Sequence, residues 1–294
     1  MDTALIVEDD RDQAELAAQF VLLRDYRPVM AATGEAGLER ARELAPDVVL
    51  LDLMLPDTDG FEVCRQLRGD RRTMATPIVM VTALNTPEHR RRGFRVGANA
   101  YVTKPYGAED LFSALVAVRG WRENLRRAGI LAEISIELNS ATTFLQEVNE
   151  FLTDLYMITP LAAEQVAQLR QAVMEMGQNA IEWGNRHRMD LLVRMMYRVF
   201  ADRVEIVVRD EGPGFDRGNL PHAATPEDPL AHLDIRESLG LREGGFGLLI
   251  SRGMVDELRY NNPGNEVTLI KRFATPAPDA GAADSRTGPE AFPA

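Results

Sequence analysis

Polar side chains follow four short apolar runs in the N-terminal part of the chain. They are Glu8 and Asp9 after the first run, Asp52 after another, Thr82 after a third and Lys104 after the last. Three carboxylates repel one another and favour a hard divalent cation such as Mg²⁺ between them. With the cation in place, Asp52 could attack phosphorus and become an aspartyl phosphate, while Lys104 and the Thr82 hydroxyl could bind phosphoryl oxygens. These residues predict a phosphoryl-accepting pocket.

The apolar runs also predict the sheet that would bring these side chains together. Five runs alternate with stretches of helical spacing, at residues 4–7, 29–32, 48–51, 78–81 and 100–102. Continuous apolar runs are typical of parallel strands buried on both faces, and open sheets of this kind bind ligands beyond the carboxyl ends of their strands. We therefore expect residues 1–124 to form a doubly wound α/β domain with a five-stranded parallel sheet and an extended last helix. That helix carries an apolar stripe that could pack on its own domain or on a second copy, at Leu111, Leu115, Val118 and Leu125.

Residues 1–124 resemble a response-regulator receiver domain. The matching segments are IVEDD with Glu8 and Asp9, LLDLMLPDTDG around Asp52, VTAL at Thr82, and AYVTKP with Tyr101 and Lys104. The resemblance implies that a partner histidine kinase phosphorylates Asp52, with Mg²⁺ held by Asp9, Asp52 and the carbonyl of Met54. It also implies a switch in which Thr82 moves toward the phosphoryl group and Tyr101 turns inward.

A second polar constellation follows in residues 131–273. Glu175 and Asn179 are spaced i, i+4 on an otherwise apolar helical pattern, so they share one face. A β-rich run at 204–208 leads into Asp210-Glu-Gly-Pro-Gly214, where glycines allow the backbone to approach a ligand closely. Further on, Arg242-Glu-Gly-Gly-Phe-Gly247 opens a helix, and N–H groups at a helix start bind phosphates. This order of features predicts a nucleotide site.

The elements expected around this site differ from those of the first domain. They are a half-buried strand at 133–138, helices at 141–157 and 161–184, a hairpin of 191–199 and 204–208, a mobile loop at 216–243, a helix at 248–256 and a last strand at 267–273. The hairpin requires a sheet that is at least partly antiparallel. We therefore expect residues 125–274 to form an α/β sandwich with a mixed or antiparallel sheet, and the aperiodic tail 275–294 to be disordered.

Residues 131–273 resemble the GHKL (Bergerat-type) ATPase superfamily, and more narrowly the anti-sigma-factor serine/threonine kinases. The resemblance rests on AVMEMGQNAIEWGN and MVDELRYNNPGNEVTLIKRF. It implies that Asp210 receives the adenine amino group of ATP, that Asn179 coordinates Mg²⁺ on the triphosphate, and that Glu175 is the general base. The glycines that would shape the pocket are Gly212, Gly214, Gly245 and Gly247, with Arg242 on the β- and γ-phosphates and residues 216–243 as a lid. Two departures are Trp183, where many relatives carry histidine, and Gly177, a helix-weakening residue beside the site.

Together the two resemblances predict a response regulator whose output domain is a protein serine/threonine kinase in a partner-switching pathway. The implied partners are an upstream histidine kinase, an anti-sigma-factor-antagonist-like substrate and a sigma factor, and a homodimer is possible. One alternative is an ATP-binding module that sequesters a partner without kinase turnover, and another is a degenerate ATP fold used only for dimerisation. A sensor histidine kinase is excluded because none of the four histidines lies between residues 105 and 160, where its phosphoacceptor helix would be.

Composition excludes several other classes of protein. The net charge of −12 argues against a sequence-independent grip on nucleic acid or anionic lipid. A single cysteine, Cys64, rules out an internal disulfide framework and a multi-thiolate zinc site. There is no apolar run of membrane-spanning length, and the acidic start is unlike a signal peptide. We therefore expect a cytoplasmic protein with no direct contact to nucleic acid or membrane.

Overall fold

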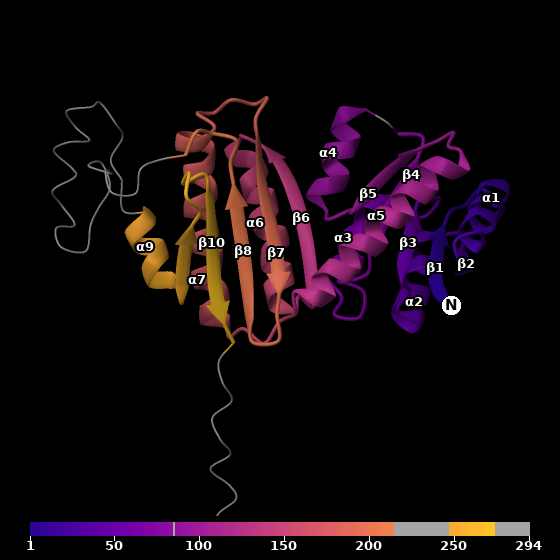
Figure 1. Cartoon of the computed structure of the whole chain (residues 1–294), viewed down its shortest axis with the longest axis horizontal. Helices are drawn as coiled ribbons and strands as arrows, with labels where there is room; N and C mark the ends of the chain where they lie inside the picture. The colour runs from indigo at the N-terminus through magenta and orange to yellow at the C-terminus, as the bar shows by residue number, and fades with distance from the viewer. Residues whose placement is uncertain (85, 215–246, 274–294) are drawn as a thin grey trace, which may run out of the picture.

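The chain folds into two five-stranded sheets that follow one another in the sequence (Figure 1). This computed structural model describes residues 1–84, 86–214 and 247–273. The predicted loop 216–243, Arg242, Gly245 and the tail 275–294 lie outside the described residues. Within the described part, no helix combines the length and the apolar character needed to cross a membrane.

The N-terminal sheet is parallel throughout, with strand order β2-β1-β3-β4-β5. Its strands are β1 (Asp2–Val7), β2 (Tyr26–Ala31), β3 (Val48–Leu51), β4 (Ile78–Thr82) and β5 (Ala100–Thr103). The helices between and after them are α1 (Arg11–Leu22), α2 (Gly34–Leu44), α3 (Gly60–Arg68), α4 (Pro87–Arg95) and α5 (Ala108–Arg127). The predicted doubly wound fold is confirmed. Strand β2 begins three residues earlier than predicted, since an edge strand tolerates Pro28.

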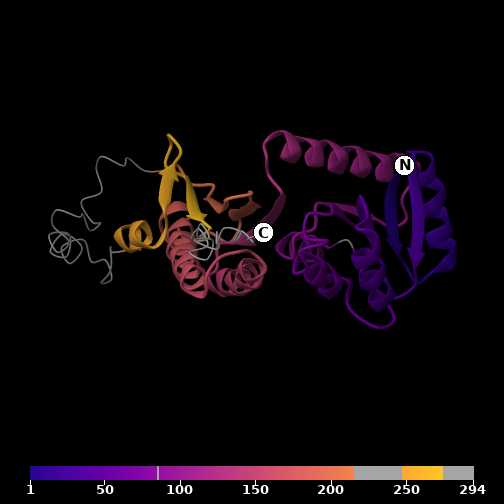
Figure 2. The same cartoon turned by 90° about the horizontal axis from the view of Figure 1, so that it is seen from below.

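Apolar side chains fill both faces of this sheet. One buried cluster joins the sheet to α1 and α5, and the other joins it to α2 and α3. Leu111, Leu115 and Val118 of the α5 stripe belong to the first cluster, so they pack on their own domain. Cys64 is fully buried in the second cluster, where burial raises the pKa of its thiol to about 11. Figure 2 shows α5 running along the N-terminal sheet and on toward the C-terminal one.

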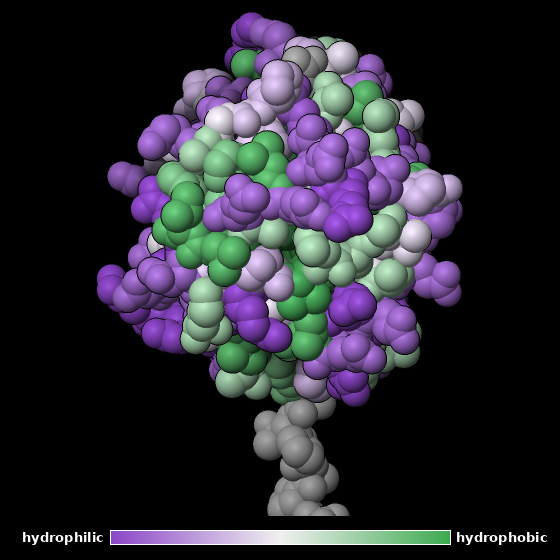
Figure 3. All heavy atoms as spheres, turned by 90° about the vertical axis from the view of Figure 1, so that its right-hand side faces the viewer, coloured by the Kyte–Doolittle hydropathy of each residue, from purple (hydrophilic) through white to green (hydrophobic). Residues whose placement is uncertain are grey.

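The side of the N-terminal domain that faces away from the C-terminal domain carries α1 and the edge strand β2 (Figure 1). Figure 3 looks at this side, where hydrophobic side chains are broken up by hydrophilic ones. Leu22, Leu23 and Met30 are the large apolar side chains that α1, its C-cap and β2 expose. Interspersed charged groups and a proline are features that keep an edge strand from pairing with another chain.

The C-terminal sheet has the order β6-β7-β8-β10-β9, and each neighbouring pair is antiparallel. Its strands are β6 (Ala132–Asn139), β7 (Leu192–Val199), β8 (Arg203–Arg209), β9 (Glu257–Tyr260) and β10 (Glu266–Arg272). The helices are α6 (Thr142–Met157), α7 (Ala163–Asn179) and α9 (Gly247–Met254), and a π-helical turn, Ala180–Gly184, follows α7. The predicted antiparallel sandwich is confirmed. Strand β9 was missed, because four half-exposed or exposed residues give no periodic signal.

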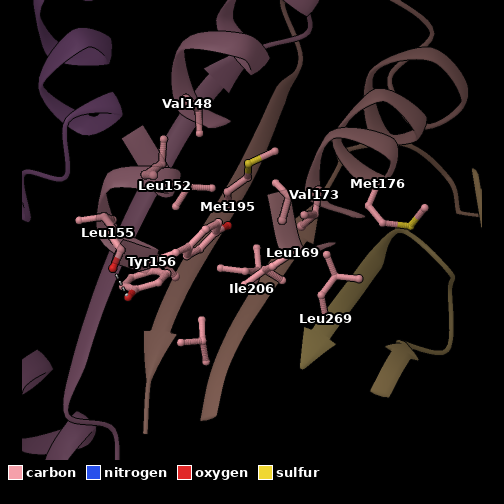
Figure 4. Close-up of a cluster of buried hydrophobic side chains, with 14 of the residues drawn as sticks. Val148, Leu152, Leu155, Tyr156, Leu169, Val173, Met176, Met195, Ile206 and Leu269 are labelled. Carbon is pink, nitrogen blue, oxygen red and sulfur yellow. Dashed lines mark hydrogen bonds between the residues drawn. The ribbon is translucent and has the colours of Figure 1, made fainter. Parts of the chain in front are cut away.

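Helices α6 and α7 cover one face of the C-terminal sheet and bury a single apolar cluster against it (Figure 4). Leu155 and Tyr156 of α6 and Leu169 of α7 are fully buried there. Tyr197 of β7 donates its hydroxyl to the carbonyl of Leu155 at 3.1 Å, which ties the helix layer to the sheet. Met176, near the end of α7, reaches the same cluster. The core therefore fixes the part of α7 that carries the predicted nucleotide residues.

The two domains meet where α4 packs against β6, and side chains of α3 and α4 also reach α6. Arg65 of α3 pairs with Asp154 of α6 at 2.8 Å, and Arg95 of α4 pairs with Glu147 at 3.4 Å. The Arg95 guanidinium also lies 4.5 Å from the ring centroid of Phe144. These ionic and cation–π contacts join α3 and α4 to α6 through long side chains, while α4 itself packs against β6.

The connection between α3 and β4 adds apolar and backbone contacts to this interface. Met74 is 8% exposed and packs in the C-terminal core cluster. Arg71 donates a hydrogen bond to the carbonyl of Ile158, just after α6. On the other flank, the Trp121 indole N–H of α5 donates to Glu133 of β6 at 3.0 Å. The interface therefore includes buried apolar surface as well as exposed ion pairs.

Arg68, the last residue of α3, is fully buried and organises the N-terminal side of the interface. Its guanidinium donates to the carbonyls of Met74, Thr76 and Gly97 and to the side-chain oxygen of Asn99. Burial lowers the pKa of Arg68, and neutral oxygens serve as its acceptors in place of a carboxylate. Arg68 thereby ties the α3–β4 connection to the α4–β5 connection.

We expect Arg68→Met to destabilise β4 and β5 by about 3 kcal/mol, because several buried carbonyls would lose their donor. Amide hydrogen exchange over these strands in the full chain measures the free energy of local opening. Arg11→Met is the control, since that side chain is 89% exposed and its ion pair is worth less than about 1 kcal/mol. Equal exchange in the two variants would contradict the assigned role of Arg68.

Candidate functional sites

The first predicted site lies at the carboxyl edge of the N-terminal sheet. Glu8 follows β1 and Asp52 follows β3, and these two strands are neighbours. Carboxylate oxygens of Glu8, Asp9 and Asp52 all lie within 4.8 Å of one another. Glu8 and Asp52 are buried and Asp9 is exposed, so the cluster opens to solvent on one side. Three convergent oxygens are a donor set that fits a magnesium ion.

Lys104 lies between the two buried carboxylates. Its ammonium nitrogen is 2.5 Å from a Glu8 oxygen and 2.7 Å from Asp52 Oδ2. Burial alone would lower the pKa of Lys104, but the hydrogen bonds to Asp52 and Glu8 raise it. Burial raises the pKa of Glu8, and the bond from Lys104 offsets only part of that effect. Lys104 is therefore held as a cation in the position expected for a phosphoryl partner.

The Asp52 carboxylate is fixed from both sides. Its Oδ1 accepts hydrogen bonds from the backbone N–H groups of Leu53 and Met54, at 2.6 and 3.2 Å, and its Oδ2 faces Lys104. The Met54 side chain is exposed, and its backbone forms a bridge with Asp59. The segment that holds Asp52 also contains the Met54 carbonyl that the resemblance assigns to the metal.

Thr82 and Tyr101, the two predicted switch residues, meet at one backbone residue. Thr82 is fully buried at the end of β4, and its hydroxyl accepts a hydrogen bond from the Leu84 N–H at 3.3 Å. The Tyr101 hydroxyl donates to the Leu84 carbonyl. Arg90 of α4 lies 5.2 Å from the centroid of the Tyr101 ring. The segment after β4 thus connects both side chains to α4.

Gly60 is a site residue that the sequence analysis missed. A Cβ at this position would lie 2.2 Å from the carbonyl oxygen of Asp52. Asp59 beside it caps α3 through the Phe61 N–H and pairs with Arg92 of α4 at 3.0 Å. The DTDG tetrapeptide before the helix was the available signal, since an Asp–Gly pair is typical of a tight turn.

The second predicted site centres on Asp210, immediately after β8. Asp210 is 8% exposed, and its Oδ1 accepts a hydrogen bond from the Gly212 N–H at 2.8 Å. Burial raises the pKa of this carboxyl group. A Cβ on Gly184 would lie 2.3 Å from Asp210, and one on Gly212 would lie 2.3 Å from the Gly184 carbonyl. Gly214 has φ +78°, a conformation that favours glycine.

Glu175 and Asn179 occupy the last part of α7 and are both half-buried. A Glu175 oxygen accepts a hydrogen bond from Gln171 at 3.1 Å. Gly177 lies between them, and a Cβ there would be 2.4 Å from Leu145 of α6 and 2.9 Å from Met195 of β7. Close packing explains this glycine, which the sequence suggested only as a weak point in the helix.

The remaining predicted nucleotide residues are only partly described. Gly247 is the first residue of α9, as expected for a glycine-rich segment that opens a helix. Trp183, where a histidine was expected from the resemblance, is 43% exposed in the π-helical turn. Asp210 and Gly184 bring the end of this turn against the loop after β8.

Two asparagines that support the Asp210 loop were also missed. The Asn185 side-chain oxygen accepts a hydrogen bond from the Glu211 N–H at 2.9 Å. Asn265 donates to the carbonyls of Asp210 and Gly212 at 3.4 and 3.3 Å. Each asparagine follows a glycine, in WGN and PGN, and this pattern is the only sequence signal for them.

Comparisons with known proteins assign a family to each of the two domains. Residues 4–116 match the response regulator receiver domain family. A "DNA-binding dual master transcriptional regulator RpaA" of Synechocystis sp. is 36% identical over 134 residues, which cover 46% of this chain and 56% of that protein. The transcriptional regulatory protein AfsQ1 of Streptomyces coelicolor is 42% identical over 127 residues, covering 42% and 55% of the two chains. The chain thus spans about half the length of these curated relatives.

Solved structures also resemble the N-terminal domain. The chemotaxis protein CheY4 of Vibrio cholerae is 30% identical with a TM-score of 0.39, covering 40% of this chain and 98% of that one. The C-terminal part, residues 117–271, matches the histidine kinase-like ATPase domain family. The chain belongs to the histidine kinase-like ATPase domain family, and it joins that domain to an N-terminal response regulator receiver domain.

Proposed function

We propose that this response regulator is phosphorylated on Asp52 and thereby controls an ATP-dependent serine/threonine protein kinase built on its C-terminal domain. The observation that carries the proposal is the presence, in one chain, of a lysine-paired aspartate within a three-carboxylate cluster and of close glycine contacts around the buried Asp210. The two sites lie on domains that touch through α4 and α6. The proposed location is the cytoplasm, where a histidine kinase would supply the phosphoryl group.

The C-terminal site has the chemistry that an adenine nucleotide requires. Within the described residues, Asp210 accepts the Gly212 N–H on Oδ1 and its Oδ2 has no donor, so Oδ2 would accept the amino group of adenine. Gly184 and Gly212 let the π-helical turn approach the Asp210 loop closely, because a Cβ on either residue would collide with the other segment. Asn179, one turn beyond Glu175, offers an amide oxygen to Mg²⁺ on the phosphates. Bound Mg·ATP would supply the transferable phosphoryl group.

Glu175 is proposed as the general base. Its carboxylate is half-buried at the end of α7 and oriented by the hydrogen bond from Gln171. A carboxylate in this position can take the proton of a substrate serine or threonine as its oxygen attacks phosphorus. Glu175 and Asn179 share a helix face, so the general base and the ligand of the cation would lie near the same phosphate group.

In the receiver domain, Asp52 is the proposed nucleophile. Glu8, Asp9 and Asp52, with the Met54 carbonyl, would hold Mg²⁺, which neutralises charge on the incoming phosphoryl group. Lys104 would shift its contact from Asp52 to a phosphoryl oxygen. Attack by an Asp52 oxygen forms the acyl phosphate bond as the bond to the donor kinase breaks.

Contacts of α4 would couple this pocket to the proposed kinase site. Arg92 and Arg90 of α4 contact Asp59 and Tyr101, both close to the phosphoacceptor, while Arg95 contacts Phe144 of α6. Helix α6 packs on α7, where Leu145 touches Gly177 between Glu175 and Asn179. A shift of α4 would therefore change the position of α7, which carries Glu175 and Asn179. Coupling along this route is part of the proposal.

The proposed protein partners follow from the kinase class. They are an upstream histidine kinase, a small anti-sigma-factor-antagonist-like protein with an acceptor serine, and a sigma factor released by the resulting partner switch. A homodimer would be compatible with the receiver, although the apolar stripe of α5 that could have formed it packs on its own domain.

We expect Asp210→Asn to weaken Mg·ATP binding by about 30-fold or more, because the site loses a buried acceptor for the adenine amino group. Glu175→Gln should leave the Kd for ATP within about twofold and slow phosphoryl transfer by about 100-fold or more. Calorimetry measures binding, and radiolabelled ATP with an anti-sigma-factor-antagonist-like protein measures transfer. Asp202→Asn, on the exposed β7–β8 turn, is the control.

Two outcomes of that experiment would redirect the function. ATP binding without transfer in the wild-type protein would indicate a sequestering module. The absence of nucleotide binding would leave a receiver joined to an interaction domain.

Asp9→Asn should weaken Mg²⁺ binding to the receiver domain by about tenfold or more, because one of three carboxylate ligands loses its charge. Asp12→Asn is a matched control, since Asp12 is also exposed but lies outside the cluster. Calorimetric titration with MgCl₂ in the absence of nucleotide reports this site. Equal affinities in the two variants would remove Asp9 from the ligand set.

We expect beryllofluoride, a mimic of the aspartyl phosphate, to change the Kd for ATP by about fivefold. Arg65→Asp should reduce that change to below about twofold, because it places two like charges where a 2.8 Å ion pair stood. The double variant Arg65→Asp with Asp154→Arg should restore the response. Arg119→Asp, which reverses an ion pair within the receiver, is the control. A full response in Arg65→Asp would exclude this contact from the coupling.

A further inference from the structure

Asn185 forms a buried polar junction in the ATPase domain. It is 1% exposed, and its amide nitrogen donates to the Ser140 hydroxyl at 2.8 Å and to the Leu192 carbonyl at 2.9 Å. Its side-chain oxygen accepts the backbone N–H of Glu211 at 2.9 Å. Both donors of the amide and one lone pair of its oxygen are therefore used. A buried amide satisfied to this extent has one orientation.

The partners of Asn185 come from three other segments of the fold. Ser140 lies between β6 and α6, Leu192 begins β7, and Glu211 follows Asp210 at the end of β8. Asn185 itself follows the π-helical turn that continues α7. A single side chain thus joins the helix that carries Glu175 to the loop that carries Asp210.

The backbone of the π-helical turn packs closely against the Asp210 loop at this junction. A Cβ on Gly184 would lie 2.3 Å from the Asp210 carboxylate carbon, and one on Gly212 would lie 2.3 Å from the carbonyl of Gly184. The two segments are in van der Waals contact immediately beside the hydrogen bond from Glu211 to Asn185. A displacement of Asn185 must therefore move Asp210 relative to α7.

Ser140 anchors the other end of the junction. Ser140 is 2% exposed, and its hydroxyl donates to the Leu191 carbonyl at 3.0 Å while it accepts from Asn185. Asn265 supports the Asp210 loop from the opposite side through weaker contacts, of 3.3 to 3.4 Å, to backbone carbonyls. Of these two asparagines, only Asn185 ties the Asp210 loop to the end of α7.

We infer that Asn185 is a positioning residue for base recognition, which holds the Asp210 carboxylate where the amino group of adenine can reach it. The inference rests on the proposed ATP binding of this domain. It assigns to Asn185 no contact with the nucleotide. Substituting Asn185 must therefore weaken the binding of a nucleotide only if that nucleotide carries the amino group that Asp210 accepts. This dependence distinguishes a positioning role from a general contribution to stability.

The test compares ATP with inosine triphosphate, which carries a carbonyl oxygen in place of the adenine amino group. In the full-length protein, Asn185→Ala should weaken Mg·ATP binding by about tenfold and Mg·ITP binding by less than about twofold, since only ATP uses the positioned carboxylate. Calorimetry gives both Kd values, and thermal unfolding is recorded for each variant.

Asn149→Ala is the matched control. Asn149 is a buried asparagine of the same domain, 3% exposed on α6, and its side-chain oxygen has no hydrogen-bond partner within the described residues. It should change neither Kd by more than about twofold. If Asn149→Ala reduced the preference for ATP over ITP as much as Asn185→Ala does, the inference would be overturned.

Ser140→Ala provides a second variant should Asn185→Ala fail to fold. It removes one acceptor of the amide and leaves the contact of Asn185 with Glu211, so ATP binding should weaken by about two- to threefold with ITP unchanged. Equal losses for ATP and ITP, or no loss for ATP, would overturn the positioning role while leaving the proposed nucleotide site intact. Failure of the wild-type protein to bind either nucleotide would overturn both.

Discussion

The receiver pocket depends on one ammonium group that lies between two buried carboxylates. Lys104 contacts Glu8 at 2.5 Å and Asp52 at 2.7 Å, and without it two negative charges would face each other at the end of a sheet. The strand order places β1 and β3 side by side, so that these acids converge, and β5 carries the lysine to them across β4. The parallel sheet is therefore what makes this arrangement of charge possible.

In the ATPase domain, the buried carboxyl group of Asp210 has different surroundings. Asp210 is held by a backbone N–H and by tight glycine contacts, and burial raises the pKa of its carboxyl group. Among the described residues, Asp210 accepts a side-chain hydrogen bond from the Gly212 N–H and has no cationic partner, whereas Asp52 accepts two backbone N–H groups and also contacts the Lys104 ammonium group. The two acidic sites thus differ in charge, because one contains an ammonium group and the other is held by neutral backbone groups.

Arginine connects the two domains. Arg65 and Arg95 reach α6 with their charged ends, whereas Arg68 is buried entirely and holds the backbone segments from which this surface is built. The guanidinium group suits both tasks, because its planar fork can satisfy several carbonyls at once and can also lie on an aromatic ring. Through its arginine side chains, α4 contacts both Asp59, beside the phosphoacceptor loop, and Glu147 of α6.

The sequence by itself determined the parallel receiver sheet and the meeting of Glu8, Asp9, Asp52 and Lys104 at its carboxyl edge. Apolar strand runs are local signals, and the carboxyl ends of parallel strands must meet at one edge, so residues that directly follow these runs were bound to converge. Only the tertiary structure decided the contact of α3 and α4 with α6, the burial of Arg68, the junction at Asn185 and the close approach that requires Gly177. These depend on side chains brought together from distant segments by packing, and no periodicity along the chain records which of them will meet.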